Sequence, residues 1–208
     1  MPPRHKTEQQ RQEIRNAIID AAREMFIARG VEAVTMREIA KKVGYSPTAL
    51  YLHFEDRDAI LQAICDTDFL ALANGMQAIM REPDLIKRIN LLAQGYTQFA
   101  LSHPNHYRLM FMTPRVCDPN ASIMQKENTE QDAYAQLKLV VREAFAAHCF
   151  RPELTDAELI AQTLWAGIHG VCSLQIALAN DTWVNWRNIE QRLHLMQQSL
   201  MRGLLRHS

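Results

Sequence analysis

The stretch Thr35–Phe54, which reads TMREIAKKVGYSPTALYLHF, limits the possible folds of this chain more than any other segment. Four apolar residues in its first half recur at the spacing of one helix face: Met36, Ile39, Ala40 and Val43. Thr35 stands at an N-cap position and Glu38 follows three residues later, which is the spacing of a capping box. Gly44 then supplies the residue type that most readily ends a helix in a left-handed conformation. The pattern predicts a helix over Met36–Val43.

A second, shorter helix is predicted directly after this turn, from Pro47 to about His53. Ser46 is a favourable N-cap, and Pro47 occupies the first helical position, where its missing N–H group costs nothing. Leu50 and Phe54 share the inward face. The outward or sideways face is left to Thr48, Ala49, Tyr51 and His53. This arrangement predicts a helix-turn-helix whose second helix enters the DNA major groove; the alternative is an αα-hairpin inside a larger helical domain.

The polar residues of this region divide by their expected role on DNA. Phosphate contacts fix the position of a protein on the duplex, whereas base-edge contacts read its sequence. The residues expected to hold phosphates are Thr35, Tyr51 and Arg57, with Lys41 and Lys42 adding charge near the backbone. The candidates for base edges or groove contacts are Arg37, Tyr45, Ser46, Thr48 and His53. Arg57 lies in the first turn of the next helix, where the dipole favours an acid, so a nearby phosphate would explain a basic residue there.

Composition supports a helical protein with a basic end. The chain has 208 residues, of which 48% are hydrophobic, with only 7 glycines and 8 prolines and no alternating, strand-like runs. Its net charge is zero, but residues 1–54 carry nine Lys/Arg and six Asp/Glu, which leaves +3 there and −3 in the remainder. No apolar segment reaches the length of a membrane span, and no apolar stretch follows the basic N-terminus. We therefore expect a cytoplasmic protein that does not enter a membrane.

Residues 14–64 resemble the N-terminal domain of TetR-type transcriptional regulators, the tetracycline-repressor family. This range covers about a quarter of the chain, and the resemblance rests on AREMFIARG, V-x-A-V-T, REIAKKVGYS, A-L-Y-x-H-F and x-D-R-D-A-I. A second, shorter match joins HPNHYRLMF and the Trp165-x-x-x-His169-Gly170 signature to one C-terminal subclass of this family. The resemblance implies an all-α homodimer that binds a palindromic operator and releases it when a small molecule binds the C-terminal domain. A basic residue at the position of Arg57 contacts a phosphate in family members.

The expected fold is all-α, with a three-helix helix-turn-helix domain over residues 1–55 and a helical effector-binding and dimerisation domain over residues 56–208. The other helices are expected at about residues 8–29, 56–80, 84–102, 105–111, 123–148, 155–179 and 186–205. Thr155, with Glu158 at capping-box spacing, starts the helix over 155–179. The last two helices carry more apolar surface than one chain can cover, which predicts a four-helix interface with a second copy. Gly167 and Gly170 predict close helix approach.

Catalytic and cofactor-binding motifs are not apparent. The sequence has no Gly-rich phosphate loop, no G-x-S-x-G and no H-E-x-x-H, so we expect neither an enzyme nor a bound cofactor. His103 and His106 are separated by a helix-breaking proline, which disfavours a metal pair. The four cysteines are scattered without a C-x-x-C pair: Cys65, Cys117, Cys149 and Cys172. Buried thiols are the expected reading, and a redox-sensing pair is the alternative.

Aromatic and methionine residues crowd the middle of the chain, and methionine and aromatic side chains line adaptable cavities. The candidate effector pocket consists of Tyr96, Phe99, Tyr107, Met110, Phe111, Trp165 and His169. An ordinary core is the equally weighted alternative, with His169 as a satisfied core histidine. The leading hypothesis is a ligand-responsive repressor whose partners are an operator duplex, a small effector and a second copy. The alternatives are a regulator gated by cysteine oxidation, and a helical enzyme or protein-interaction module that does not bind DNA.

Overall fold

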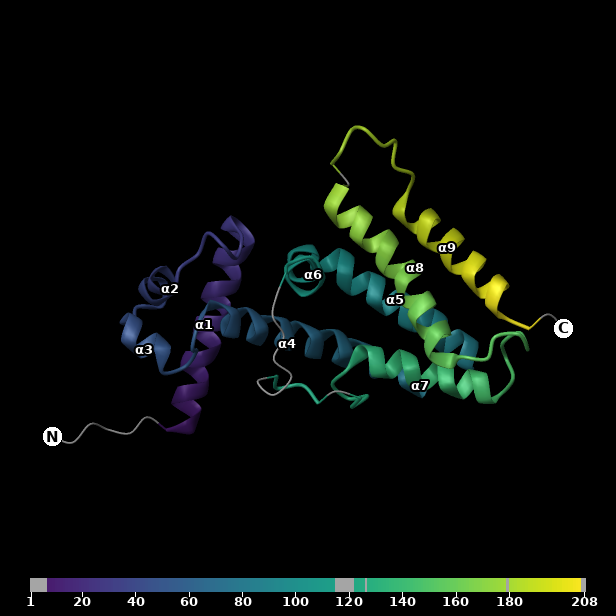
Figure 1. Ribbon diagram of the computed structural model, residues 1–208, viewed down its shortest axis with the longest axis horizontal. Coiled ribbons are helices and arrows are strands. Elements are labelled where there is room, and N and C mark those ends of the chain that lie inside the picture. The colour runs from purple at the N-terminus through teal and green to yellow at the C-terminus, as the bar shows by residue number, and fades with distance from the viewer. Residues whose placement is uncertain (1–6, 115–121, 126, 179, 207–208) are drawn as a thin grey trace. The chain divides into compact units, whose positions relative to one another are not determined.

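The computed structural model describes residues 7–114, 122–125, 127–178 and 180–206 (Figure 1). The predicted all-α fold is confirmed, because the regular elements of these residues are helices, with one isolated antiparallel bridge between Phe150 and Leu205. The elements are α1 Glu8–Arg29, α2 Met36–Val43, α3 Pro47–Tyr51, α4 Arg57–Met76, η1 Ile79–Arg81, α5 Leu85–Ser102, α6 Pro104–Phe111, α7 Ala133–Ala146, α8 Ala157–Leu178 and α9 Ile189–Leu204.

The chain forms two compact units, and each is described by itself. The first comprises residues 1–68 and 109–123, and the second comprises residues 69–108 and 124–208, within the described ranges. The first boundary falls inside α4, after Asp68. We call residues 7–58 the head and the second unit the body. The predicted division into residues 1–55 and 56–208 is a division by function, and it stays a prediction.

The turn between α2 and α3 is built by local side chains, as predicted. The Thr35 hydroxyl accepts from the Glu38 backbone N–H at 3.3 Å, and the Glu38 carboxylate accepts from the Thr35 N–H at 2.8 Å. Gly44 takes φ 76° and ψ 23°, a left-handed conformation that suits glycine. Ser46 caps α3 by accepting from the Ala49 N–H at 3.2 Å. These groups satisfy backbone donors that the helix starts would otherwise leave unpaired.

The sequence also predicts a small core of the head formed by Phe26, Ile39, Leu50 and Phe54, and burial confirms it. All four residues are at most 3% exposed. The prediction that α3 extends to His53 is wrong, because the helix ends at Tyr51. The Arg15 guanidinium donates to the His53 carbonyl at 2.9 Å, so this carbonyl is satisfied by α1 rather than by another helical turn.

Three predicted helix starts need correction. The helix expected from residue 123 begins only at Ala133, because Asp132 caps it by accepting from the N–H groups of Tyr134 and Ala135. Asp156, not Thr155, caps α8, with its carboxylate 2.8 Å from the Glu158 N–H. The last helix, expected from residue 186, begins at Ile189 after an Asn188 cap. The sequence also predicts a proline-punctuated loop over residues 113–122 and disorder over residues 1–8. Most of that loop, including Cys117, and residues 1–6 lie outside the described residues.

Helices α8 and α9 approach each other closely at Gly167. A Cβ atom there would lie 2.5 Å from Leu200 Cδ1 and 2.9 Å from Met196 Sδ, so the predicted close approach is confirmed at this glycine. Gly170 meets nothing within 4 Å inside the chain. By length and composition α8 could cross a membrane, but core helices of soluble proteins pass the same test.

We expect Gly167→Val to destabilise the protein by about 1–3 kcal/mol, because the added atoms overpack the contact with Leu200 and Met196. The measurement is the free energy of unfolding from urea titration. Gly75→Val is the matched control, since Gly75 is also helical and a Cβ atom there meets nothing within 4 Å. An equal loss of stability in both variants would contradict the close-approach account.

Candidate nucleic-acid interface and effector site

The predicted base-reading residues lie on an accessible surface of the head. Ser46, Thr48 and Arg37 are exposed, Tyr51 is 54% exposed, and Leu50 between them is fully buried. Tyr45 and His53 are half-buried. The inward and outward faces of α3 therefore divide as the sequence predicted, and the short helix presents hydroxyl groups and a phenol to solvent.

Several positive charges of the head are compensated inside the head itself. Lys42 Nζ lies 2.6 Å from Glu24 Oε2, and Arg29 Nη1 lies 2.8 Å from Glu38 Oε1. The Arg29 ion pair and the Thr35 hydrogen bonds lower the pKa of Glu38 to about 2, so this capping residue stays ionised. Among the ion pairs that the structure gives for the described residues, none involves Arg37 or Lys41, and both side chains are exposed.

Arg57 has protein partners that the sequence did not predict. Its Nη2 atom lies 2.7 Å from Glu32 Oε2, and its Nη1 atom donates to the Val31 carbonyl at 3.1 Å. The side chain is 26% exposed, whereas that of Glu32 is 87% exposed. The guanidinium is thus fixed at the start of α4 next to a carboxylate that faces solvent.

Two further residues of the head were missed. Arg15 lies 4.1 Å above the Phe54 ring while it donates to the His53 carbonyl, so it holds the end of α3. Local spacing could not reveal this contact, because 38 residues separate Arg15 from His53. Leu52, next to Tyr51, is 83% exposed. The only sequence feature that could have indicated this exposure is the position of Leu52 off the helix face shared by Leu50 and Phe54.

In the body, three of the predicted pocket residues form one polar cluster. The Tyr107 hydroxyl lies 2.6 Å from His169 Nδ1 and 3.0 Å from the Tyr96 hydroxyl, which is itself 2.9 Å from His169 Nδ1. Burial lowers the pKa of His169, which favours the neutral ring and lets Nδ1 accept when the proton is on Nε2. Burial also raises the pKa of Tyr96 to about 12, so both phenols remain protonated donors.

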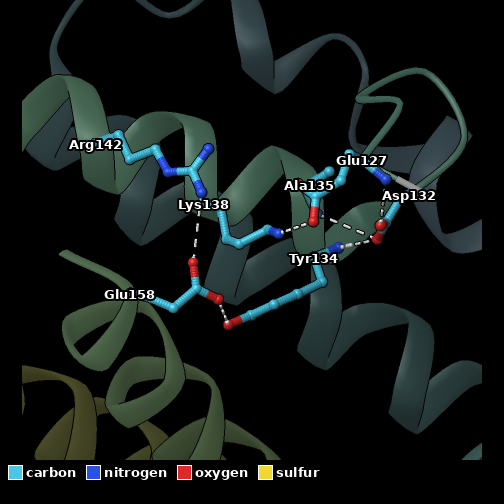
Figure 2. Close-up of polar contacts among 7 residues, drawn as sticks. All are labelled: Glu127, Asp132, Tyr134, Ala135, Lys138, Arg142 and Glu158. Carbon is cyan, nitrogen blue, oxygen red and sulfur yellow. Dashed lines mark hydrogen bonds and ion pairs between the residues drawn. The ribbon is translucent and has the colours of Figure 1, made fainter.

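A second group of contacts extends this cluster toward α7. The Trp165 ring centroid lies 6.1 Å from that of His169 and 5.2 Å from that of Tyr134. Figure 2 shows the Tyr134 hydroxyl pointing at Glu158, with which it forms a 2.6 Å hydrogen bond. Lys138, which is buried, pairs with Glu127 and lies 5.1 Å above the Tyr134 ring. Sequence spacing did not indicate that Tyr134, Lys138 and Glu158 belong to this group of contacts.

Three other residues were predicted to line the pocket. Phe99 stacks on His103 with ring centroids 5.1 Å apart, while Met110 and Phe111 belong to the first unit. The pocket therefore stays a prediction, centred on Tyr96, Tyr107, Trp165 and His169. Among the described residues, no group of three or more His, Cys, Asp or Glu side chains could hold a metal ion.

Two of the three described cysteines are shielded from solvent. Cys65 and Cys172 are fully buried, and Cys149 is half-buried. Burial raises the pKa of Cys172 to about 11, which keeps it a thiol rather than the reactive thiolate.

Comparison with known proteins gives consistent matches over both parts of the chain. The description "Bacterial regulatory proteins, tetR family" matches residues 18–64, and "Tetracyclin repressor-like, C-terminal domain" matches residues 89–183. The HTH-type transcriptional activator FasR of Mycolicibacterium smegmatis is 30% identical over 135 residues, 64% of this chain and 62% of FasR. The HTH-type transcriptional regulator TtgR of Pseudomonas putida is 26% identical over 178 residues, 80% of this chain and 81% of TtgR.

The solved structures agree on the fold. A protein of unknown function from Rhodococcus sp. RHA1 matches with a TM-score of 0.73 and 24% identity, over 99% of this chain and 100% of that one. The sequence matches are shorter: the chain spans less than two thirds of FasR, and 28% of the regulator SrpR from Pseudomonas putida.

The lowered pKa of His169 predicts a pH-dependent stability. Because the unfolded ring has a pKa of about 6.5, the unfolded chain binds more protons than the folded one below that value. Stability should therefore fall as the pH drops through about 6.5 toward the folded-state pKa. We expect the urea midpoint to fall less between pH of about 7.5 and 5.5 in His169→Gln than in the unmodified protein.

The control for this experiment is His148→Asn at an exposed, left-handed position, where φ is 55° and asparagine is tolerated. This variant measures the effect of replacing a histidine outside the cluster. If His169→Gln shows the same fall of the urea midpoint with pH as the unmodified protein, His169 is not the source of the pH dependence.

Proposed function

This chain belongs to the tetR family of bacterial regulatory proteins, and from that premise we propose that it is a ligand-responsive transcriptional repressor that binds a palindromic DNA operator as a homodimer. The observation that carries the DNA-binding part is the division of α3 into a buried face at Leu50 and an exposed face at Thr48 and Tyr51. A short capped helix with exposed hydroxyl groups suits the major groove.

The roles proposed on DNA follow from exposure. Tyr51 and Thr35 contact phosphates, and Ser46, Thr48 and Arg37 reach base edges or the groove wall. Lys41 contributes charge near the backbone. Tyr45 and His53 are half-buried, so they contribute at the edge of this surface.

The proposed dimer uses the last two helices. In the described chain, α8, α9 and their connection expose large apolar side chains: Leu159, Leu174, Leu178, Trp183, Val184 and Leu195. A second copy would cover this surface through a two-fold axis, because each protomer offers the same helices. The dimer would then place two heads about 34–36 Å apart, or a multiple of this, on the operator.

The proposed effector site is the cluster of Tyr96, Tyr107, Trp165 and His169. It offers aromatic faces together with a few convergent polar groups, which is the usual composition of a small-molecule site. An effector that prefers the body conformation incompatible with DNA would weaken operator binding by roughly 1–3 kcal/mol. Burial of Cys65 and Cys172 makes gating by these two cysteines the weaker alternative.

A gel shift with the promoter upstream of the protein's own gene tests the proposal. Binding at low salt, competed by the unlabelled palindrome but not by random duplex, is the expected result. No shift at low salt would instead favour the alternative of a protein-interaction module.

Tyr51→Phe and Thr48→Ala should have different effects on DNA recognition. Tyr51→Phe removes a phosphate partner and should weaken binding to every operator alike, whereas Thr48→Ala should change sequence preference by about 1–3 kcal/mol at one position. Selection from a randomised operator library measures both effects. A uniform loss across the library for Thr48→Ala would contradict its base-reading role.

Leu174→Glu should raise the dimer dissociation constant by at least about tenfold, because it places a charge in the proposed interface. Sedimentation equilibrium measures the change. The matched control is Leu139→Glu on α7: Leu139 is 38% exposed and Leu174 is 44% exposed, so both leucines are partly open to solvent. Equal dissociation constants for the unmodified protein, Leu174→Glu and Leu139→Glu would contradict a dimer interface that includes Leu174 on α8.

A further inference from the structure

A small cleft in the head lies beside Arg57, between the starts of two helices. Its lining comprises Glu32, residues 34–36 and residues 56–58. α2 begins here with its Thr35 cap, and α4 begins here with Asp56, whose carboxylate accepts from the Ala59 N–H at 2.8 Å. Helix N-termini carry partial positive charge, so the cleft favours an anion next to the guanidinium.

In the DNA-free head that anion is Glu32. Its carboxylate oxygen lies 2.7 Å from Arg57 Nη2, which is a short, charge-assisted contact. The Val31 carbonyl accepts from Arg57 Nη1 at 3.1 Å, and Asp58 Oδ1 lies 3.8 Å from Arg57 Nε. Asp58 is therefore too distant for a hydrogen bond, and Glu32 is the carboxylate that forms a hydrogen-bonded ion pair with the Arg57 guanidinium.

The exposure of the two side chains shows which of them can move. Arg57 is 26% exposed and is also anchored to the Val31 backbone, whereas the Glu32 side chain is 87% exposed and is held by its contact with Arg57. An incoming anion can therefore displace Glu32 into water at little cost while Arg57 keeps its place. Carboxylate and phosphate oxygens make the same kind of contact with a guanidinium group.

We propose that Glu32 is an internal competitor for DNA phosphate: it holds Arg57 ready in the free head and gives way to a backbone phosphate when the head binds DNA. The proposal rests on the proposed DNA-binding function. Glu32 is then a positioning residue that sets the absolute affinity of the head for DNA. It keeps Arg57 oriented, and it lowers the affinity because its own contact must be replaced.

Glu32→Gln tests this competition. Removing the competing charge should tighten operator binding about two- to fivefold at low salt, the range expected for one exposed ion pair. The gain should shrink above about 0.5 M salt, where exposed charges are screened. In an Arg57→Gln background the gain should fall to that of simple charge removal, because no guanidinium remains to be released.

Glu55→Gln is the matched control for simple charge removal. Glu55 is exposed, lies two residues from Arg57, and makes no ion pair that the structure gives. Its gain comes only from weaker repulsion of DNA, so it should be equal with and without Arg57. Glu32→Asp, which keeps the charge, should stay within about twofold of the unmodified protein. Thermal unfolding of each variant checks that the head remains folded.

The outcomes separate the two levels of the proposal. If the unmodified protein binds no DNA at low salt, the proposed function fails and the competition fails with it. If the protein binds DNA but the full gain of Glu32→Gln persists in the Arg57→Gln background, the competition alone is overturned. A loss of affinity in Glu32→Gln, with an unchanged melting temperature, would also overturn it.

Discussion

The packing of α3 against α2 is the constraint on which the proposed DNA-binding surface depends. A helix of five residues has no stability of its own, because isolated helices of that length do not repay the cost of nucleation. It persists here because Ser46 caps its start, Leu50 is fully buried, and Arg15 binds the carbonyl of His53 beyond its end. The same anchoring leaves Thr48 and Tyr51 on a surface whose shape the core fixes.

Electrostatic compensation is the second principle of the head. In the DNA-free head, Lys42, Arg29 and Arg57 each form an ion pair with a glutamate. Arg23 Nη2 lies 3.0 Å from Asp68 Oδ1. The last pair links α1 to α4 with both side chains largely buried, so breaking it would leave a charge in a poorly solvated place. Because both partners of the Arg29 and Lys42 pairs lie in residues 1–54, these pairs leave the net charge of +3 there unchanged. They instead reduce the number of basic side chains that, like Arg37 and Lys41, are exposed and outside the ion pairs given for the described residues.

The parts of the structure that depend on neighbouring residues were predictable from the sequence. The capping box of Thr35 and Glu38 and the turn at Gly44 follow from residue type and spacing. Glycine content predicted close helix approach at both Gly167 and Gly170, and the chain shows it only at Gly167, where residues of α9 decide it. The predictions failed where distant residues decide the outcome. Sequence spacing could not reveal that Glu32 would occupy Arg57, or that α7 would bring Tyr134 to Glu158 (Figure 2). Of the candidate pocket, which stays a prediction, Tyr96, Tyr107 and His169 contact one another, whereas Phe99 stacks on His103. Met110 and Phe111 belong to the first unit.

The missing side chain at Gly167 leaves a notch in α8 that receives Met196 and Leu200, and this notch also determines how α9 lies along α8. Met196 and Leu200 are one helical turn apart and both meet this glycine, so sliding α9 by a single turn would remove one of them from the notch and leave a void. Axial register is thereby encoded by the helices and not by the segment that joins them. Insertions or deletions over residues 180–188 should consequently be tolerated among natural variants, while residue 167 stays small.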